Sequence, residues 1–211
     1  IDPAICSYRP ERGCEDIWLP QAIRVEYALL FNQPLAGFNA DLAKAFDRVP
    51  IDILLQLAEA IGMDANIVRA MRAMYKQLQR RWKLGPFVGD VFKSTNGILQ
   101  GCPLSVVLLN MLIHIWAAAL RAEVPLASPT AFADDLGATG HSAVVVNAAL
   151  QHLHEFCQLT HMQINAGKSG KWATSGQLRR RLLGTCRVDG KEVPLIYDER
   201  NLGAFVSFTK R

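Results

Sequence analysis

Two adjacent carboxylates close a short apolar run in the stretch TAFADDL, residues 130–136. If this run is a buried strand, its end carries the charges of Asp134 and Asp135, and removing charged groups from water costs free energy. Taken alone, Asp-Asp is a common turn dipeptide, and turn propensity favours that ordinary interpretation. Asp41 stands in a comparable position, at the end of the alternating segment PLAGFNAD. Two strand ends that meet in one sheet would give these carboxylates a chemical purpose.

Three carboxylates in a small volume repel one another, which disfavours their joint ionisation unless a cation is bound. A divalent cation with hard oxygen ligands removes that repulsion. No His or Cys accompanies the set, so magnesium or manganese is favoured over zinc. Two such ions about 3.5–4 Å apart can activate an attacking oxygen and stabilise a leaving one during phosphoryl transfer.

The elements that must position these residues mix helices and strands without a regular βαβ repeat, which predicts the α+β class. A helix is predicted over residues 14–31, where Pro20 marks its start or a kink, and a strand over 34–41. Further helices are predicted over residues 52–61, 64–83, 104–120 and 142–160 and near 179–181, with hairpins over 82–96 and at the terminal NLGAFVSF.

Basic side chains recur at three- and four-residue steps through the predicted helix 64–83. They are Arg69, Arg72, Lys76, Arg80 and Lys83. Such a stripe is ordinarily a solvated helix face, and that is the simplest interpretation. The alternative is contact with the phosphate backbone of a nucleic acid.

The bulk composition fits one globular domain, because half of the 211 residues are hydrophobic and a fifth are charged. The net charge of +4 is compatible with a polyanionic partner and equally with an ordinary soluble protein. Five cysteines without a C-x-x-C pair predict reduced thiols and an intracellular protein, with neither disulfides nor a zinc site. The apolar run 104–120 is interrupted by polar residues, so a buried helix and no membrane segment are expected. The N-terminus starts at Ile1 and lacks the features of a signal peptide, which suggests a piece of a longer chain.

Four segments resemble motifs A to D of reverse transcriptases, in the order and at roughly the spacing of that family. They are FNADLAKAFDRVP, GILQGCPLSVVLLNMLI, AFADDLGATG and MQINAGKSG, and their wording is closest to the LINE-type, non-LTR retrotransposon branch. YRPERGCEDIWLPQAI resembles the fingers motif of the family, and NLGAFVSF resembles the strand that closes the palm. The resemblance implies a right-hand polymerase palm, an antiparallel sheet backed by helices. It places partial fingers at residues 1–33 and the palm at 34–211, with a fingers insertion at 62–100 and no thumb.

The resemblance assigns the catalytic centre residue by residue. Asp41 and Asp134 match the two metal-binding aspartates, the Leu42 carbonyl matches a further oxygen ligand, and Asp135 matches a weaker ligand. Lys168 matches the lysine near the leaving pyrophosphate, where a cation offsets charge that develops on the leaving group.

The resemblance also implies residues that bind the substrate. Phe46 matches the steric gate, whose ring collides with a ribose 2′-hydroxyl, although a Phe is ordinarily a core residue. Gln100 matches the family's nucleotide contact, and Gly101 beside it lets the backbone approach a ligand closely. Arg9 and Arg12 in the fingers motif are candidates for contact with the triphosphate or the template, and surface arginines are the ordinary alternative.

The implied function is an RNA-directed DNA polymerase with two Mg²⁺ ions, or Mn²⁺, acting on an RNA template, a DNA primer and dNTPs. An RNA-dependent RNA polymerase shares the paired Asp, but Phe46 and the FADD wording speak against it. A noncatalytic nucleic-acid-binding remnant is the third hypothesis, and the intact carboxylates and Lys168 speak against decay of the site. The isolated 211 residues are expected to polymerise weakly or not at all.

Overall fold

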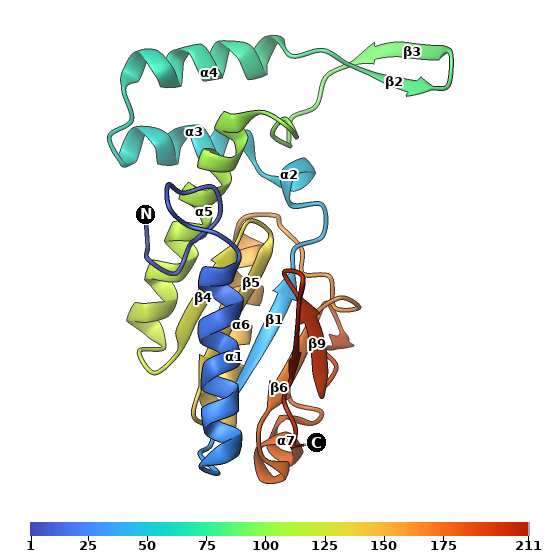
Figure 1. The fold of residues 1–211 in the computed structure, drawn as a ribbon. Coiled ribbons are helices and arrows are strands. Elements are labelled where there is room, and N and C mark those ends of the chain that lie inside the picture. Colours follow the sequence, from blue (N-terminus) through green and yellow to red (C-terminus); the bar gives the residue numbers. More distant parts are fainter. Residues whose placement is uncertain (211) are drawn as a thin grey trace.

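The computed structural model describes residues 1–210, and its centre is a four-stranded antiparallel sheet in the order β4-β5-β1-β6. The strands are β1 (Ala36–Asp41), β4 (Ser128–Phe132), β5 (Asp135–Gly140) and β6 (Gly170–Ala173). Helices α5 (Pro103–Glu123) and α6 (Ala143–Leu159) cover one face, and α1 (Glu15–Leu30) lies across the other (Figure 1). The predicted strand ending at Asp41 and the predicted helices 14–31, 104–120 and 142–160 are therefore confirmed.

The two faces of the sheet differ because side chains alternate along each strand. Phe38, Ala40, Leu136 and Ala138 point into the main core with α5 and α6. The opposite face carries small and polar residues, and Gly37 is required there, because a Cβ atom would lie 2.5 Å from the Trp172 ring. Asp41 shares this second face with Gly37, two strand alternations away.

Helix α5 contributes a long run of buried residues to the main core. Pro103 begins it, as suits the first helical turn, and Trp116 is fully buried at its centre. By length and composition α5 is the one helix among the described residues that could cross a membrane, yet 56% of its most apolar window is buried inside the fold. Its apolar surface packs against α3, α6 and strand β4.

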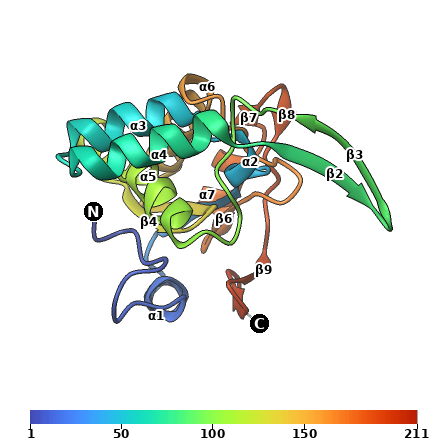
Figure 2. The same cartoon turned by 90° about the horizontal axis from the view of Figure 1, so that it is seen from above.

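A second unit projects beyond the end of the sheet (Figures 1 and 2). It consists of α2 (Ala45–Arg48), α3 (Ile51–Ala60), α4 (Ala65–Gln77) and the hairpin β2 (Arg80–Leu84) and β3 (Phe87–Phe92). Gly62, with φ +84, follows the end of α3 in the left-handed region that favours glycine after a helix.

The predicted helix 64–83 is wrong at its C-terminal end. Helix α4 stops at Gln77, and Leu78 is already extended, with φ −61 and ψ 119. Residues 80–84 instead pair with 87–92 across a turn at Gly85, whose φ is +58. The cross-strand pairing outweighed helical propensity, so the basic stripe is divided between a helix and a strand.

The C-terminal part of the chain packs at the β6 edge of the sheet. It contains α7 (Gly176–Leu182), β7 (Arg187–Val188), β8 (Lys191–Glu192), β9 (Asp198–Asn201) and β10 (Ala204–Ser207). Phe208 stacks on Trp172 with ring centroids 4.4 Å apart, and both pack with Val25 and Ala28 of α1 in a second core. Residue 211, the end of the predicted palm, lies outside the described residues, and the partition into fingers and palm stays a prediction.

Candidate active site

The two strand ends that carry the carboxylates are adjacent in the sheet. Asp41, at the end of β1, is the direct cross-strand partner of Asp135, at the start of β5. The Leu42 amide donates a hydrogen bond of 3.0 Å to the Asp134 carbonyl oxygen. Backbone pairing therefore fixes Asp41 relative to Asp134 and Asp135, which lie more than ninety positions later in the sequence.

The turn between β4 and β5 is held in an unfavourable conformation. Ala133 has φ +52, a region that residues with a Cβ atom avoid at a cost of roughly 1–2 kcal/mol. Residues 4–6 support the turn from outside, since Cys6 donates to the Ala131 carbonyl at 3.0 Å and Ala131 donates to Ala4 at 2.9 Å. Tyr8 adds a ring contact with Phe132, 6.4 Å between centroids. The N-terminal segment thus braces the turn that presents Asp134.

A small cavity of about 30 Å³ opens beside the carboxylates. Its polar lining comes from Asn39, Asp41, Thr130, Asp135, Lys168 and Glu199. Lys168 is exposed and lies in a turn, where its amide donates a hydrogen bond of 3.0 Å to the Asn165 carbonyl. The structure therefore brings Lys168 to the same cavity as Asp41 and Asp135.

The carboxylates affect one another's ionisation. Desolvation, the charges of Asp134 and Asp41, and Glu199 together raise the pKa of Asp135 to about 6. Desolvation also raises the pKa of Asp134, and Asp41 adds to that effect. The charge of Lys168 acts in the opposite direction on both groups. The site thus holds more negative charge than it can stabilise by itself, which favours binding of a cation.

Glu199 and Asn39 belong to this site and were not predicted from the sequence. Asn39 donates a short hydrogen bond from Nδ2 to the Glu199 carboxylate, which ties β9 to the central strand β1. Burial raises the pKa of Glu199, and the bond from Asn39 opposes the shift. Strand alternation from Asp41 could have identified Asn39, which lies two residues earlier on the same face. Glu199 comes from a separate hairpin, and no local pattern marks it.

The donor chemistry of the site fits a hard divalent cation, because the side chains at the strand ends are carboxylates. The arrangement in residues 1–210 does not, however, form a group of three or more His, Cys, Asp or Glu side chains ready to hold a metal ion. The site therefore fits a divalent cation by the chemistry of its oxygen donors and by its negative charge.

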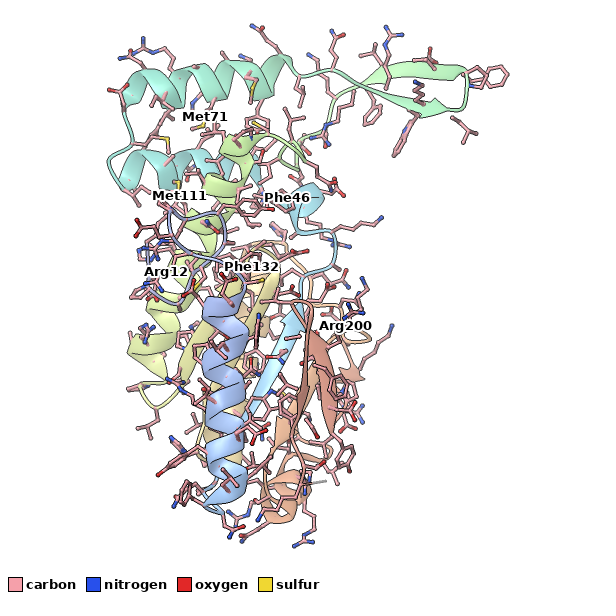
Figure 3. The ribbon with its side chains drawn as sticks, viewed as in Figure 1. Arg12, Phe46, Met71, Met111, Phe132 and Arg200 are labelled. Carbon is pink, nitrogen blue, oxygen red and sulfur yellow. The ribbon has the colours of Figure 1, made fainter. Side chains whose placement is uncertain are left out.

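Phe46 lies on α2, beyond the end of β1 (Figure 3), and the segment that precedes Gln100 is hydrogen-bonded to it. Phe46 is half-buried in α2 and packs against the main core, and its carbonyl accepts a hydrogen bond from the Ile98 amide at 2.7 Å. Gly97 permits this approach, since a Cβ there would lie 2.8 Å from the Asp47 carbonyl oxygen. Gln100 and Gly101 are exposed in the following loop, and Gly101 has φ +83.

Arg9 and Arg12 have local partners instead of a place in the carboxylate cavity. Arg9 donates from Nη1 to the Ile5 carbonyl at 3.0 Å, and Arg12 pairs with Asp16 at 3.3 Å. The described structure thus uses both arginines to shape the N-terminal segment.

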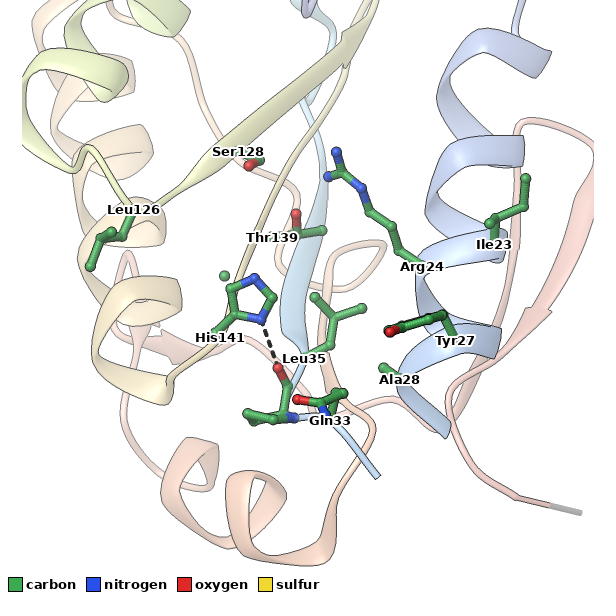
Figure 4. Close-up of a pocket in the computed structure, with 12 residues that line it drawn as sticks. Ile23, Arg24, Tyr27, Ala28, Gln33, Leu35, Leu126, Ser128, Thr139 and His141 are labelled. Carbon is green, nitrogen blue, oxygen red and sulfur yellow. Dashed lines mark hydrogen bonds between the residues drawn. The ribbon is translucent and has the colours of Figure 1, made fainter. Parts of the chain in front are cut away.

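A larger cavity, of about 660 Å³, lies at the opposite end of β5 (Figure 4). Its walls include Ile23, Arg24 and Tyr27 of α1 and His141, which contacts the Pro34 carbonyl at 2.8 Å. None of the predicted site residues lines it.

Comparison with known sequences gives a consistent set of similarities. Residues 1–186 match the family model described as reverse transcriptase (RNA-dependent DNA polymerase). The chain is 22% identical to a retrovirus-related Pol polyprotein from the type-2 retrotransposable element R2DM of Drosophila melanogaster, covering 85% of this chain and 18% of that protein. It is 31% identical to a Pol polyprotein from a type-1 element R2 of Popillia japonica, covering 46% of this chain and 18% of that protein. The chain thus spans less than a fifth of either relative.

Solved structures with a similar fold include telomerases. The chain matches telomerase from Candida tropicalis with a TM-score of 0.60 and 12% identity, covering 76% of this chain and 30% of that one. It matches telomerase from Candida albicans with a TM-score of 0.58 and 13% identity, covering 79% and 31%. These matches confirm the predicted α+β polymerase fold.

Proposed function

This chain belongs to the reverse transcriptase (RNA-dependent DNA polymerase) family, and we propose that it forms the palm and part of the fingers of an RNA-directed DNA polymerase from a non-LTR retrotransposon. One observation carries the proposal beyond family membership. Asp41 and Asp135 are direct partners at the end of the sheet, and a backbone hydrogen bond joins Leu42 to Asp134.

The proposed reaction is nucleotidyl transfer, in which a primer 3′-hydroxyl attacks the α-phosphate of a dNTP and pyrophosphate leaves. Reverse transcriptases use divalent metal ions, and two bound Mg²⁺ ions would stabilise charge on the attacking and leaving oxygens. Asp41 and Asp134, with the Leu42 carbonyl, would hold the ions, and Asp135 would be a weaker ligand. Their mutual repulsion in the described structure supports this assignment.

The remaining side chains would position the substrates. Lys168, which already faces the carboxylate cavity, would offset charge on the pyrophosphate and supply a proton to it. Phe46 would exclude a ribose 2′-hydroxyl by steric contact, and Gln100 would touch the incoming nucleotide. The proposed partners are an RNA template, a DNA primer and dNTPs.

The test is primer extension on poly(rA)/oligo(dT) with dTTP and Mg²⁺, using the chain expressed in its full reading frame. Asp134→Ala should abolish incorporation, and Glu155→Ala, an exposed carboxylate on α6, should leave it unchanged. Equal incorporation by wild type and Asp134→Ala would sink the proposal. Incorporation of ribonucleotides in preference to dNTPs would instead point to an RNA polymerase.

A further inference from the structure

The hairpin β2–β3 exposes large apolar side chains far from either core. We call residues 80–93 the hairpin arm, and it extends away from the body of the molecule (Figures 1 and 2). Trp82, Leu84 and Phe87 are 76%, 81% and 77% exposed. A two-stranded hairpin is marginally stable by itself in water, and contiguous exposed apolar surface commonly marks an interaction site. A binding partner would account for both features.

The aromatic groups on the arm form an ordered surface. The rings of Trp82 and Phe92 stack across the two strands, with centroids 5.4 Å apart and planes 18° from parallel. Gly89 faces Trp82 on the opposite strand, where an added Cβ atom would lie 3.7 Å from Trp82, so that strand adds no side chain there. The exposed Trp82 indole therefore offers a flat, solvent-facing surface on which another ring can stack.

The charges around this surface are mostly positive. Arg81, Lys83 and Lys93 are exposed, and the arm contains one carboxylate, Asp90. Among the described residues none of these three cations forms an ion pair within 4.0 Å. Aromatic groups interleaved with unpaired cations match a single-stranded nucleic acid, whose bases stack and whose phosphates are anionic.

A cavity of about 400 Å³ at the root of the arm continues the positive surface. Arg72 and Lys76 of α4 line one wall, and Lys93, Ser94 and Thr95 line the other. Asp52 is the carboxylate in the lining, and Arg72 also pairs with Glu59 outside it at 2.7 Å. Cations and hydroxyl groups facing one cavity suit a phosphate group of a strand that passes along the arm.

The root of the arm is joined to the segments that carry Phe46 and Gln100. Arg80 donates from Nη2 to the Gly97 carbonyl at 3.0 Å, which fixes the start of β2 to the loop before Gln100. The Gly97 amide donates to the Val49 carbonyl at 2.9 Å, just after α2. A strand bound on the arm would therefore lie next to the segments that are proposed to select the nucleotide.

We infer that the hairpin arm and the cavity at its root bind single-stranded nucleic acid, the template strand beside the polymerase site. The inference rests on the proposed function for the identity of the strand, and on the arm's own chemistry for binding. Trp82 stacks on a base, Arg81 and Lys83 contact phosphates along the arm, and Lys93 with Lys76 contacts a phosphate in the cavity. Arg80 positions the arm and does not contact the strand. Such binding is independent of base sequence and sensitive to salt.

The test is fluorescence anisotropy of a labelled 20-nucleotide oligo(rU) titrated with the 211-residue chain at several salt concentrations. Trp82→Ala should weaken binding about tenfold, as expected for the loss of one base-stacking contact. The double variant Lys83→Glu, Lys93→Glu should weaken it further and lower the slope of log K against log salt by about one or more. Matched controls are Tyr27→Ala, an exposed aromatic on α1, and Lys191→Glu, an exposed cation on β8.

The outcomes separate this inference from the proposed function. Binding by both arm variants that equals wild type overturns the inference, whatever the polymerase assay gives. Loss of binding in the arm variants, with controls unchanged, supports it even if primer extension fails. A change of oligomeric state in Trp82→Ala without a change in binding shows that the arm docks protein, and also overturns it. Circular dichroism verifies folding, and the charge variant alters no buried residue.

Discussion

The end of the central sheet and the hairpin arm are built in opposite ways. At the sheet end, Asp41 pairs with Asp135 on one side, and on the other side its carbonyl accepts a hydrogen bond of 2.8 Å from the Asn165 amide. A body of helices packs behind the sheet. The arm consists of two strands that pair with one another, and its tip contacts solvent. Nucleotidyl transfer requires the reacting atoms to be held to a fraction of an ångström. A nucleic-acid strand that moves along the protein is better bound by a surface that can change its shape. The difference in rigidity thus corresponds to the difference in proposed task.

The largest predicted effect contrasts one carboxylate from each region. Asp41→Ala should reduce primer extension by about a thousandfold or more, because the loss of metal-binding charge removes several kcal/mol of transition-state stabilisation. Asp90→Ala on the arm should stay within about twofold, since Asp90 lies outside the carboxylate cavity. Single-turnover incorporation measures both. A comparable loss in the two variants would mean that the contrast between the regions is false.

Two glycines give the corresponding contrast in stability. Gly37→Ala should lower the free energy of unfolding by about 1–3 kcal/mol, because the new Cβ overlaps the Trp172 ring and the Ala138 carbonyl. Gly89→Ala on the arm meets Trp82 only at 3.7 Å and should change it by less than about 0.5 kcal/mol. Urea denaturation followed by circular dichroism gives both values. Equal destabilisation would show that the arm is packed as tightly as the sheet.

Phe46 stands where the two regions join, and its replacement should alter selectivity more than stability. Phe46→Ala should raise ribonucleotide incorporation relative to dNTPs about tenfold or more, because the ring that would meet the 2′-hydroxyl is gone. Competition between dTTP and UTP on the same primer measures the ratio. The arm variant Trp82→Ala is the control and should keep the wild-type ratio. An unchanged ratio in Phe46→Ala would leave its ring as an ordinary core side chain.

The smallest predicted effect concerns metal addition. Mg²⁺ at about ten times its dissociation constant should stabilise the chain by about 1.4 kcal/mol, since it binds the folded carboxylates and relieves their repulsion. Thermal unfolding with Mg²⁺ and with EDTA measures the shift. Asp41→Asn should lose the shift, and Lys83→Glu on the arm should retain it. Stabilisation that persists in Asp41→Asn would place the ion elsewhere.

The sequence identified the sheet end well, because several independent patterns agree there. Strand alternation placed Asp41 at a strand end, and the motif order paired it with Asp134 and Asp135. Local preferences and long-range pairing favour the same structure in this region, so the sequence was sufficient. Glu199 escaped prediction because its contact with Asn39 depends on how a distant hairpin docks.

In the arm, the predicted hairpin over residues 82–96 is confirmed, and only its boundary with the predicted helix 64–83 is wrong. Basic residues at helical spacing suggested one long helix, but Trp82 and Phe92 gain more from packing across two strands. The cavity at the root could not be foreseen either, since Arg72 and Lys93 come together only when the chain turns back after β3. The basic stripe is solvated surface at the exposed Arg69, as the simplest interpretation has it. The other cations have separate places: Arg72 and Lys76 line the cavity at the root of the arm, Lys83 lies on the arm, and Arg80 donates to the Gly97 carbonyl.

The strand edges of the molecule bear on its self-association. Residues 4–6 pair with the outer edge of β4, and Lys171 of β6 bridges to Leu195, so both margins of the central sheet are protected from pairing with another copy. The arm has no such cover among the described residues. Exposed cations such as Arg81 and Lys83, and a proline at the turn (Pro86), are features that hinder the pairing of such an edge with another copy. Replacing Arg81 and Lys83 by neutral residues is expected to lower the solubility of the chain more than its folding stability. A polyanion that neutralises these charges by binding must itself cover the exposed strand edge.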